Sequence, residues 1–156
     1  MPQSQFDYSC FIAVPPSLIY EYLSEPEHYR GLQPLVIVVR DVEYGKDNEG
    51  RQTRCYVAVE RFRFLGFLRY DNPIRVLVTL AKPEELLINN VEARFNVRVN
   101  FVTTFQPENG GTQVAETVTI RAPRLLQSYT VNQAKAAQYA RFTTLKSLLE
   151  AAHTRA

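Results

Sequence analysis

The chain has 156 residues, of which 46% are hydrophobic and 22% charged, with a formal net charge of +2 and a pI near 8.6. This length predicts one domain, residues 1–156, that can bury a core without a metal or a disulfide. The small net charge argues against a nucleic-acid-binding protein, because a phosphate-binding face normally carries a basic cluster.

The distribution of charged and apolar residues predicts a soluble, cytoplasmic protein with no integral membrane segment. No run of about 18 apolar residues occurs, and the N-terminus lacks a basic region followed by an apolar segment. Arginines in the middle of the chain are interleaved with Glu60, Asp71 and Glu92. This mixing predicts a solvated, ion-paired sheet face rather than a binding patch.

The first elements predicted are one strand and two short helices. Phe6–Ala13 is rich in aromatic and β-favouring residues and ends at a pair of prolines, so we expect a strand there. The prolines open a helix over Ser17–Leu23, and a second short helix is expected over Glu25–Tyr29. Both helices are too short to be stable alone, so they must pack on a sheet.

From Leu35 the hydrophobic period changes to two, which predicts an antiparallel meander of strands. The expected strands are Leu35–Tyr44, Arg51–Phe64, Phe67–Ala81, Leu86–Val91, Phe95–Phe105 and Thr112–Ala122. In the fifth, Phe95, Val97, Val99, Phe101 and Phe105 alternate with polar residues, so one face should be core and the other solvated. Alternate turns of a meander share one end of the sheet. We therefore expect Leu65-Gly66, Glu92–Arg94 and Pro123 at the same end.

Leu125–Ala152 is the longest segment with a helical period, and we expect the sheet to pack against it. Its apolar stripe repeats at steps of three or four residues, or multiples of them, and it contains Val131, Ala134, Phe142, Leu145, Leu149 and Ala152. Gln138 interrupts this stripe. The segment contains no proline or glycine, so the helix should run without a break.

The order of these elements resembles the START-like superfamily, over essentially the whole chain. The matching residues are Phe6–Ala13 with Pro15-Pro16 and Ile19-Tyr20, the segment from Glu27-His28-Tyr29 to Pro34, and Ala122-Pro123-Arg124-Leu125. The resemblance implies an α+β helix-grip fold, β-α-α-β6-α, with a curved seven-stranded antiparallel sheet wrapped around the long C-terminal helix. More narrowly, the chain looks like polyketide cyclase/dehydrase and lipid-transport (SRPBCC) proteins. These proteins bind apolar or amphipathic molecules between sheet and helix, and only some of them are enzymes.

Three polar residues fall on apolar faces and are candidate pocket residues, because burying a polar group is costly unless it is paired or wetted. Glu116 shares a face with Val114, Val118 and Ile120, and Glu60 shares one with Tyr56, Ala58, Phe62 and Phe64. Gln138 is the third. The alternative for each carboxylate is a surface position or a cross-strand ion pair with an arginine, and Arg40 is a candidate partner for either.

The sequence therefore predicts a cavity that binds, transports or sequesters a lipid, polyketide or isoprenoid-like molecule. The expected ligand-binding residues are Tyr29, Arg40, Tyr56, Glu60, Phe62, Phe64, Phe101, Glu116, Gln138 and Phe142. Two alternatives stay open. One is a cyclase or dehydratase in which Glu60 or Glu116 is the general base and Tyr29 or Tyr56 donates a hydrogen bond to an enolate. The other is a protein-interaction scaffold.

The remaining predictions concern cofactors, partners and the mouth of the cavity. No metal-ligand spacing or phosphate loop occurs, so neither a metal nor a cofactor is expected. The oligomeric state is left open, with a homodimer among the options. The apolar hairpin Phe64–Leu68, together with Tyr29–Pro34, either borders the mouth of the pocket or packs on the terminal helix.

Overall fold

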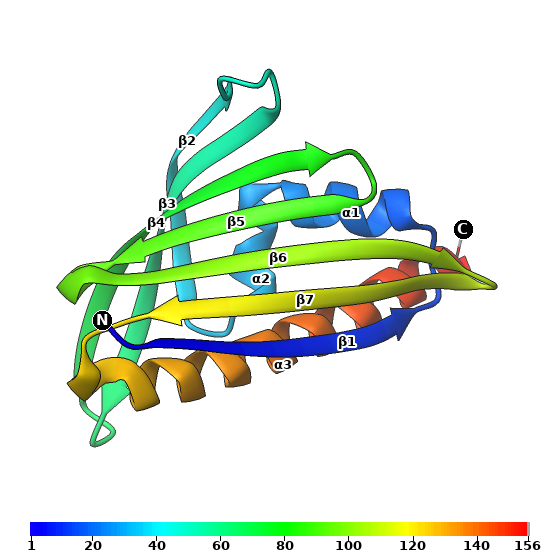
Figure 1. Ribbon diagram of the computed structural model, residues 1–156. Coiled ribbons are helices and arrows are strands. Elements are labelled where there is room, and N and C mark those ends of the chain that lie inside the picture. Colours follow the sequence, from blue (N-terminus) through cyan, green and yellow to red (C-terminus); the bar gives the residue numbers. More distant parts are fainter. Residues whose placement is uncertain (156) are drawn as a thin grey trace.

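A computed structural model describes residues 1–155, apart from the side chain of Phe64 (Figure 1). The N-terminal elements are β1 (Gln3–Ile12), α1 (Pro16–Ser24), a short 3-10 helix η1 (Pro26–His28) and α2 (Tyr29–Leu32). The meander comprises β2 (Val36–Lys46), β3 (Gln52–Phe64), β4 (Leu68–Lys82), β5 (Leu86–Ala93), the 3-10 helix η2 (Arg94–Asn96), β6 (Val97–Glu108) and β7 (Gly111–Arg121). The chain ends with α3 (Arg124–Arg155).

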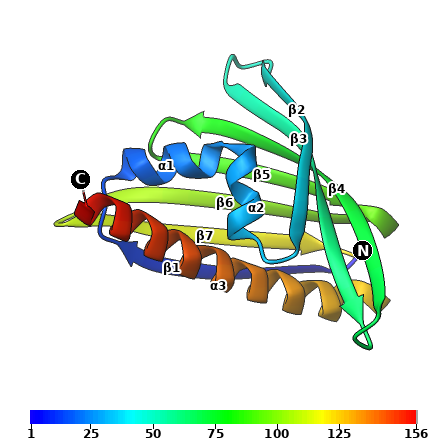
Figure 2. The ribbon, with the colours of Figure 1, turned by 180° about the vertical axis from the view of Figure 1, so that it is seen from behind.

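The seven strands form one antiparallel sheet in the order β1-β7-β6-β5-β4-β3-β2. Each strand of the meander pairs with the next one along the chain, while β1 pairs with β7 across nearly the whole sequence. All three α-helices lie on the same face of this curved sheet (Figure 2). This arrangement confirms the predicted α+β helix-grip architecture. None of the described helices is both long enough and apolar enough to cross a lipid bilayer.

Only part of α3 is tightly packed. Its buried side chains are Gln138, Arg141, Phe142 and Leu145, and the helix contacts β1, β7 and α2. Between Arg124 and Ala137, no side chain of the helix is fully buried. The first half of α3 is therefore packed less tightly on the sheet than the second half, and this leaves room for a cavity.

The core has two parts. The larger cluster joins the sheet to α1, α2 and the second half of α3, and it includes Ile12, Ile19, Leu23, Val78, Phe105, Phe142 and Leu145. The smaller cluster contains Val97, Val118, Ile120 and Ala122, with Leu126 and Ala134 packed against it. Fully burying side chains of this size contributes about 1.5 to 3 kcal/mol each, so the larger cluster holds the helices in place.

Two of the predicted boundaries are wrong. The second helix was expected over Glu25–Tyr29, but η1 covers Pro26–His28 and α2 begins only at Tyr29. Phe95 was expected at the start of an alternating strand, yet it lies in η2 with φ near 60° and is largely exposed. A left-handed backbone ends the period-two alternation, so the strand begins at Val97.

The pairing of β2 with β3 contains two register shifts, one between Val36 and Val38 and one between Arg40 and Glu43. Each shift changes which residues face the helices, because side chains alternate along a strand. Val39 therefore packs on the core, while Val38 and Arg40 are exposed. By contrast, β3 and β4 pair in continuous register through Asn72 and Pro73.

Candidate functional site

A cavity of about 360 Å³ lies between the sheet and the first half of α3. This volume is within the range of about 300 to 1,000 Å³ that is typical of small-molecule pockets. Strands β3 to β6 supply most of its walls, through residues such as Ala58, Phe62, Ile74, Val91 and Val99. Leu126, Ala134 and Ala137 of α3 cover it. The lining is mainly apolar, so the polar groups inside it stand out.

The β3–β4 hairpin, η2 and the first turns of α3 converge at one end of the molecule (Figures 1 and 2). Lining residues from β3, β4, η2 and α3 place the mouth of the cavity at this end. Tyr70, Arg94, Phe95 and Tyr129 line the cavity at this end and are all exposed. At the other end, the lining residues Tyr29, Tyr56 and Arg141 are buried. The cavity is therefore open at one end and closed at the other.

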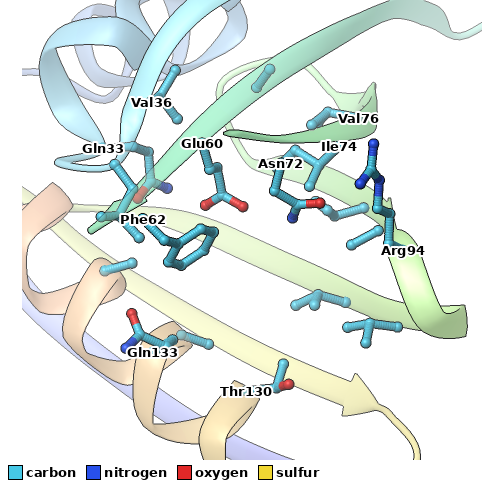
Figure 3. Close-up of a pocket in the computed structure, with 18 of the residues that line it drawn as sticks. Gln33, Val36, Glu60, Phe62, Asn72, Ile74, Val76, Arg94, Thr130 and Gln133 are labelled. Atoms are coloured by element: carbon cyan, nitrogen blue, oxygen red, sulfur yellow. The ribbon is translucent and has the colours of Figure 1, made fainter. Parts of the chain in front are cut away.

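Glu60 is an acidic group in the apolar wall of the cavity. Glu60 is two residues after Ala58 in β3, so both side chains lie on the face of the strand that lines the cavity. Its carboxylate points into the space between sheet and helix (Figure 3). Burial raises the pKa of this carboxyl from 4.5 to about 7, with no nearby charge or hydrogen bond to oppose the shift. Glu60 is thus able to exchange a proton near neutral pH.

Asn72 and Asn89 place two further polar groups in the wall. Asn72 is directly opposite Glu60 in the β3–β4 ladder, and Figure 3 shows the two side chains next to each other. The Oδ1 atoms of Asn72 and Asn89 are buried and accept no hydrogen bond, although Asn89 donates to the Tyr29 hydroxyl over 3.4 Å. Unpaired buried acceptors are costly, so these atoms favour a ligand with hydrogen-bond donors, or water.

The closed end of the cavity borders a buried polar cluster around Glu116. The carboxylate of Glu116 accepts hydrogen bonds from Thr103 Oγ1 at 2.7 Å and from Gln138 Nε2 at 3.1 Å, and it forms an ion pair with Arg141. The Arg141 guanidinium also lies over the rings of Phe101 and Phe142. A carboxylate held in this way is a structural anchor between β7 and α3, and it is poorly placed to abstract a proton from a ligand.

The structure brings together six of the ten residues that the sequence predicted for ligand binding. The cavity is lined by Tyr29, Tyr56, Glu60, Phe62, Phe101 and Gln138. Gln138 is both a lining residue and a donor to Glu116, which explains how a polar side chain is tolerated in the apolar stripe of α3. The side chain of Phe64 lies outside the described part of the structure.

Three of the predicted residues do not line the cavity. Arg40 is exposed and forms an ion pair with Asp41 at 2.8 Å, because the shifted register of β2 turns it away from the helices. Its predicted pairing with Glu60 or Glu116 is therefore wrong. Phe142 packs in the core, where it stacks on Tyr8 at 5.4 Å between ring centroids. Glu116 lies behind Gln138 and Arg141.

Sequence reasoning missed several lining residues, although some of them carried a signal. Asn72 has the same parity as Ile74 and Val76, and Asn89 has the same parity as Leu87 and Val91, so both fall on apolar faces, as Glu60 does. Arg141 is three residues after Gln138, at helical spacing. Arg94 gave no comparable signal, because η2 interrupts the alternation.

Comparison with known proteins gives no match to a protein-family model and none to a curated protein. Among solved structures, the chain is similar to the Zhui aromatase/cyclase from Streptomyces sp. R1128, with a TM-score of 0.72 and 14% identity over 96% of this chain and 94% of that one. It is also similar to TTHA0849 from Thermus thermophilus, with a TM-score of 0.69 and 18% identity over 96% and 99% of the two chains.

Two further structures extend this comparison. Ara h 8.0201 has a TM-score of 0.62 and 13% identity over 94% of this chain and 97% of that one. The chain is also similar to the di-domain ARO/CYC StfQ from the steffimycin biosynthetic pathway, with a TM-score of 0.67 and 11% identity. The match covers 93% of this chain and 50% of StfQ, so the chain spans about half the length of that protein. At identities this low, the likeness concerns the fold. The chain shares the helix-grip fold of these structures.

Proposed function

We propose that this protein binds an apolar or amphipathic small molecule in the cavity beneath α3 and transports or sequesters it. The observation that carries this proposal is a cavity of about 360 Å³ with a mainly apolar lining and one open end. An empty apolar space of this size would forfeit packing contacts, whereas a ligand would recover them. The structural likeness to aromatase/cyclases and to Ara h 8.0201 supports a site between sheet and helix.

The ligand is expected to be amphipathic because the polar groups of the lining are few and lie close together. Glu60 and Asn72 face the same part of the cavity, while Val97, Val99 and Phe101 make the wall toward β6 apolar. A hydroxyl or amine of the ligand near Glu60 would satisfy the unpaired oxygen atoms there. The apolar remainder would then lie against β6 and α3.

The binding proposal is tested by filling the cavity from α3. Ala137 lines the cavity and Ala136 is exposed, so Ala137→Phe should weaken saturable uptake of an apolar fluorescent dye by about tenfold or more. The matched control Ala136→Phe should leave uptake unchanged. If wild-type protein shows no saturable dye binding, or if both variants behave alike, the cavity is not a ligand site. Native mass spectrometry of purified protein would identify a retained ligand.

A cyclase or dehydratase is the second candidate function, and the state of Glu60 favours it. A carboxyl with a pKa of about 7 is suited to act as a general base near neutral pH, and the buried Tyr56 hydroxyl lies on the same face of β3. Glu60→Gln should then abolish turnover of an enolisable polyketone but retain its binding. Retained turnover in this variant would exclude Glu60 as the base.

A further inference from the structure

The apolar side chains around the mouth of the cavity are more exposed than any others in the described chain. Leu65 is 82% exposed, Phe67 77%, Phe95 73% and Leu125 97%, while every other large apolar side chain that the structure describes is at most 63% exposed. They come from three segments, the β3–β4 hairpin, η2 and the start of α3, which lie side by side in both views (Figures 1 and 2). We call these four residues, together with Leu68, the rim.

Positive charge accompanies the rim. Arg63 and Arg69 flank the hairpin, Arg94 precedes Phe95, and Arg124 precedes Leu125. In the part of the chain that the structure describes, none of the four forms an ion pair with a carboxylate. The sequence pattern predicted that the arginines in the middle of the chain form ion pairs with interleaved carboxylates. Between Arg54 and Arg98, the one arginine–carboxylate ion pair among the described residues joins Arg61 to Asp71 across β3 and β4.

Two of these arginines oppose each other directly. Arg63 and Arg69 are paired positions in the β3–β4 ladder, and like charges at such positions destabilise a sheet. The nearby Asp71 binds Arg61 with both oxygen atoms. The arginines that flank the rim therefore carry positive charge without an ion-pair partner among the described residues.

We propose that the rim docks on an anionic lipid surface. Exposed leucine and phenylalanine side chains enter the headgroup region of a bilayer, while flanking arginines bind anionic lipids. Leu65 and Phe67 lie in the turn of the β3–β4 hairpin, Phe95 in η2 and Leu125 in the first turn of α3. Exposed side chains on separate segments suit insertion into a fluid layer, whereas a folded protein partner would need a matching groove. A docked rim places the mouth of the cavity at the lipid surface. Docking does not depend on the cavity being occupied.

The test measures partitioning of the full chain onto vesicles by co-sedimentation. Wild-type protein should bind phosphatidylcholine vesicles that contain one-third phosphatidylglycerol, and it should bind pure phosphatidylcholine far less. Arg63→Gln/Arg69→Gln should weaken partitioning by about 30-fold, at about fivefold for each arginine near the surface. The matched control Arg75→Gln/Arg155→Gln removes the same charge from exposed positions elsewhere and should have little effect.

The apolar contribution is tested separately. Leu65→Ser/Phe67→Ser should also release the protein from anionic vesicles, while Tyr139→Ser/Leu148→Ser, which changes exposed apolar residues of α3, should not. Equal binding to both kinds of vesicle, or equal effects of rim and control variants, would overturn the proposal. Self-association that disappears in Leu65→Ser/Phe67→Ser would assign the rim to an interface between copies of this chain. Binding to polyglutamate that equals binding to anionic vesicles would assign it to an acidic protein.

Discussion

Glu60 shows how one buried carboxyl links the cavity to pH. Its pKa is raised from 4.5 to about 7 by burial, so between these values the folded chain holds a proton that the unfolded chain releases. The free energy of unfolding therefore falls as the pH rises through this window. Above it, the ionised carboxylate costs roughly 3 kcal/mol, at 1.36 kcal/mol for each pKa unit.

Replacing Glu60 by glutamine should remove this cost. Glu60→Gln is expected to raise the free energy of unfolding by up to roughly 3 kcal/mol at about pH 8, with no gain below about pH 4, where the carboxyl is protonated in both states. Urea denaturation of both proteins across this pH range measures the difference. The exposed Glu108 provides the control, and Glu108→Gln should change the free energy of unfolding little at about pH 8, because it removes no buried carboxyl. A constant difference between wild type and Glu60→Gln would contradict the raised pKa.

At the scale of elements, the contact between β7 and α3 depends on one buried ion pair. Glu116 and Arg141 are both buried, and Thr103 and Gln138 complete the hydrogen bonding of the carboxylate. A buried pair contributes little net stability, because both ions lose their hydration, but an isolated buried charge is strongly unfavourable. The pair therefore makes the position of α3 on the sheet specific.

Removing one partner should show this asymmetry. Arg141→Met is expected to lower the free energy of unfolding by about 3 to 5 kcal/mol, because it leaves the Glu116 carboxylate buried and unpaired. The double variant Arg141→Met/Glu116→Gln should recover part of the lost free energy of unfolding, because it no longer buries an unpaired charge. Lys82→Met, which breaks the exposed pair with Glu85, should cost less than about 1 kcal/mol. Chemical denaturation measures all of these variants, and a loss at Arg141 no larger than that at Lys82 would contradict this role.

At the scale of the whole molecule, the sheet is unevenly covered. Helix α3 packs over β1 and β7, α1 over β6 and α2 over β2, whereas the hairpin that joins β2 and β3 projects beyond the helices (Figure 1). Most residues from Arg40 to Gln52 are exposed, so their strand hydrogen bonds have little apolar cover. Local opening should therefore occur here more easily than in β7, where alternate residues are buried.

Hydrogen exchange should reveal this gradient. Amides of the paired residues between Glu43 and Thr53 are expected to have protection factors about 100-fold lower than those between Val114 and Ile120. Amide exchange followed by mass spectrometry or NMR measures both segments in the same sample, so the second serves as the internal reference. Uniform protection across the sheet would mean that the projecting hairpin is stabilised by contacts other than apolar burial.

The hydrophobic periodicity of the sequence was sufficient to predict most of the helices and strands of this protein. The last helix was expected over Leu125–Ala152 and extends over Arg124–Arg155, and each strand of the meander was located to within a few residues. Glu60, Glu116 and Gln138 were identified because a polar residue on an apolar face is visible in the order of residues alone. These features depend on spacing along the chain, which the sequence determines directly.

Only the tertiary structure decided what those residues do. Glu60 and Glu116 look alike in sequence, but Arg141 reaches one and no described cation reaches the other, so one is an anchor and one faces the cavity. Arg40 was misplaced because the register shift between Val36 and Val38 reverses its side of the sheet. The cavity itself exists because the first half of α3 packs on the smaller core cluster at β6 and β7 and leaves space beside β3, β4 and β5. Sheet curvature and contacts between distant elements set these distances, and neither leaves a local pattern in the sequence.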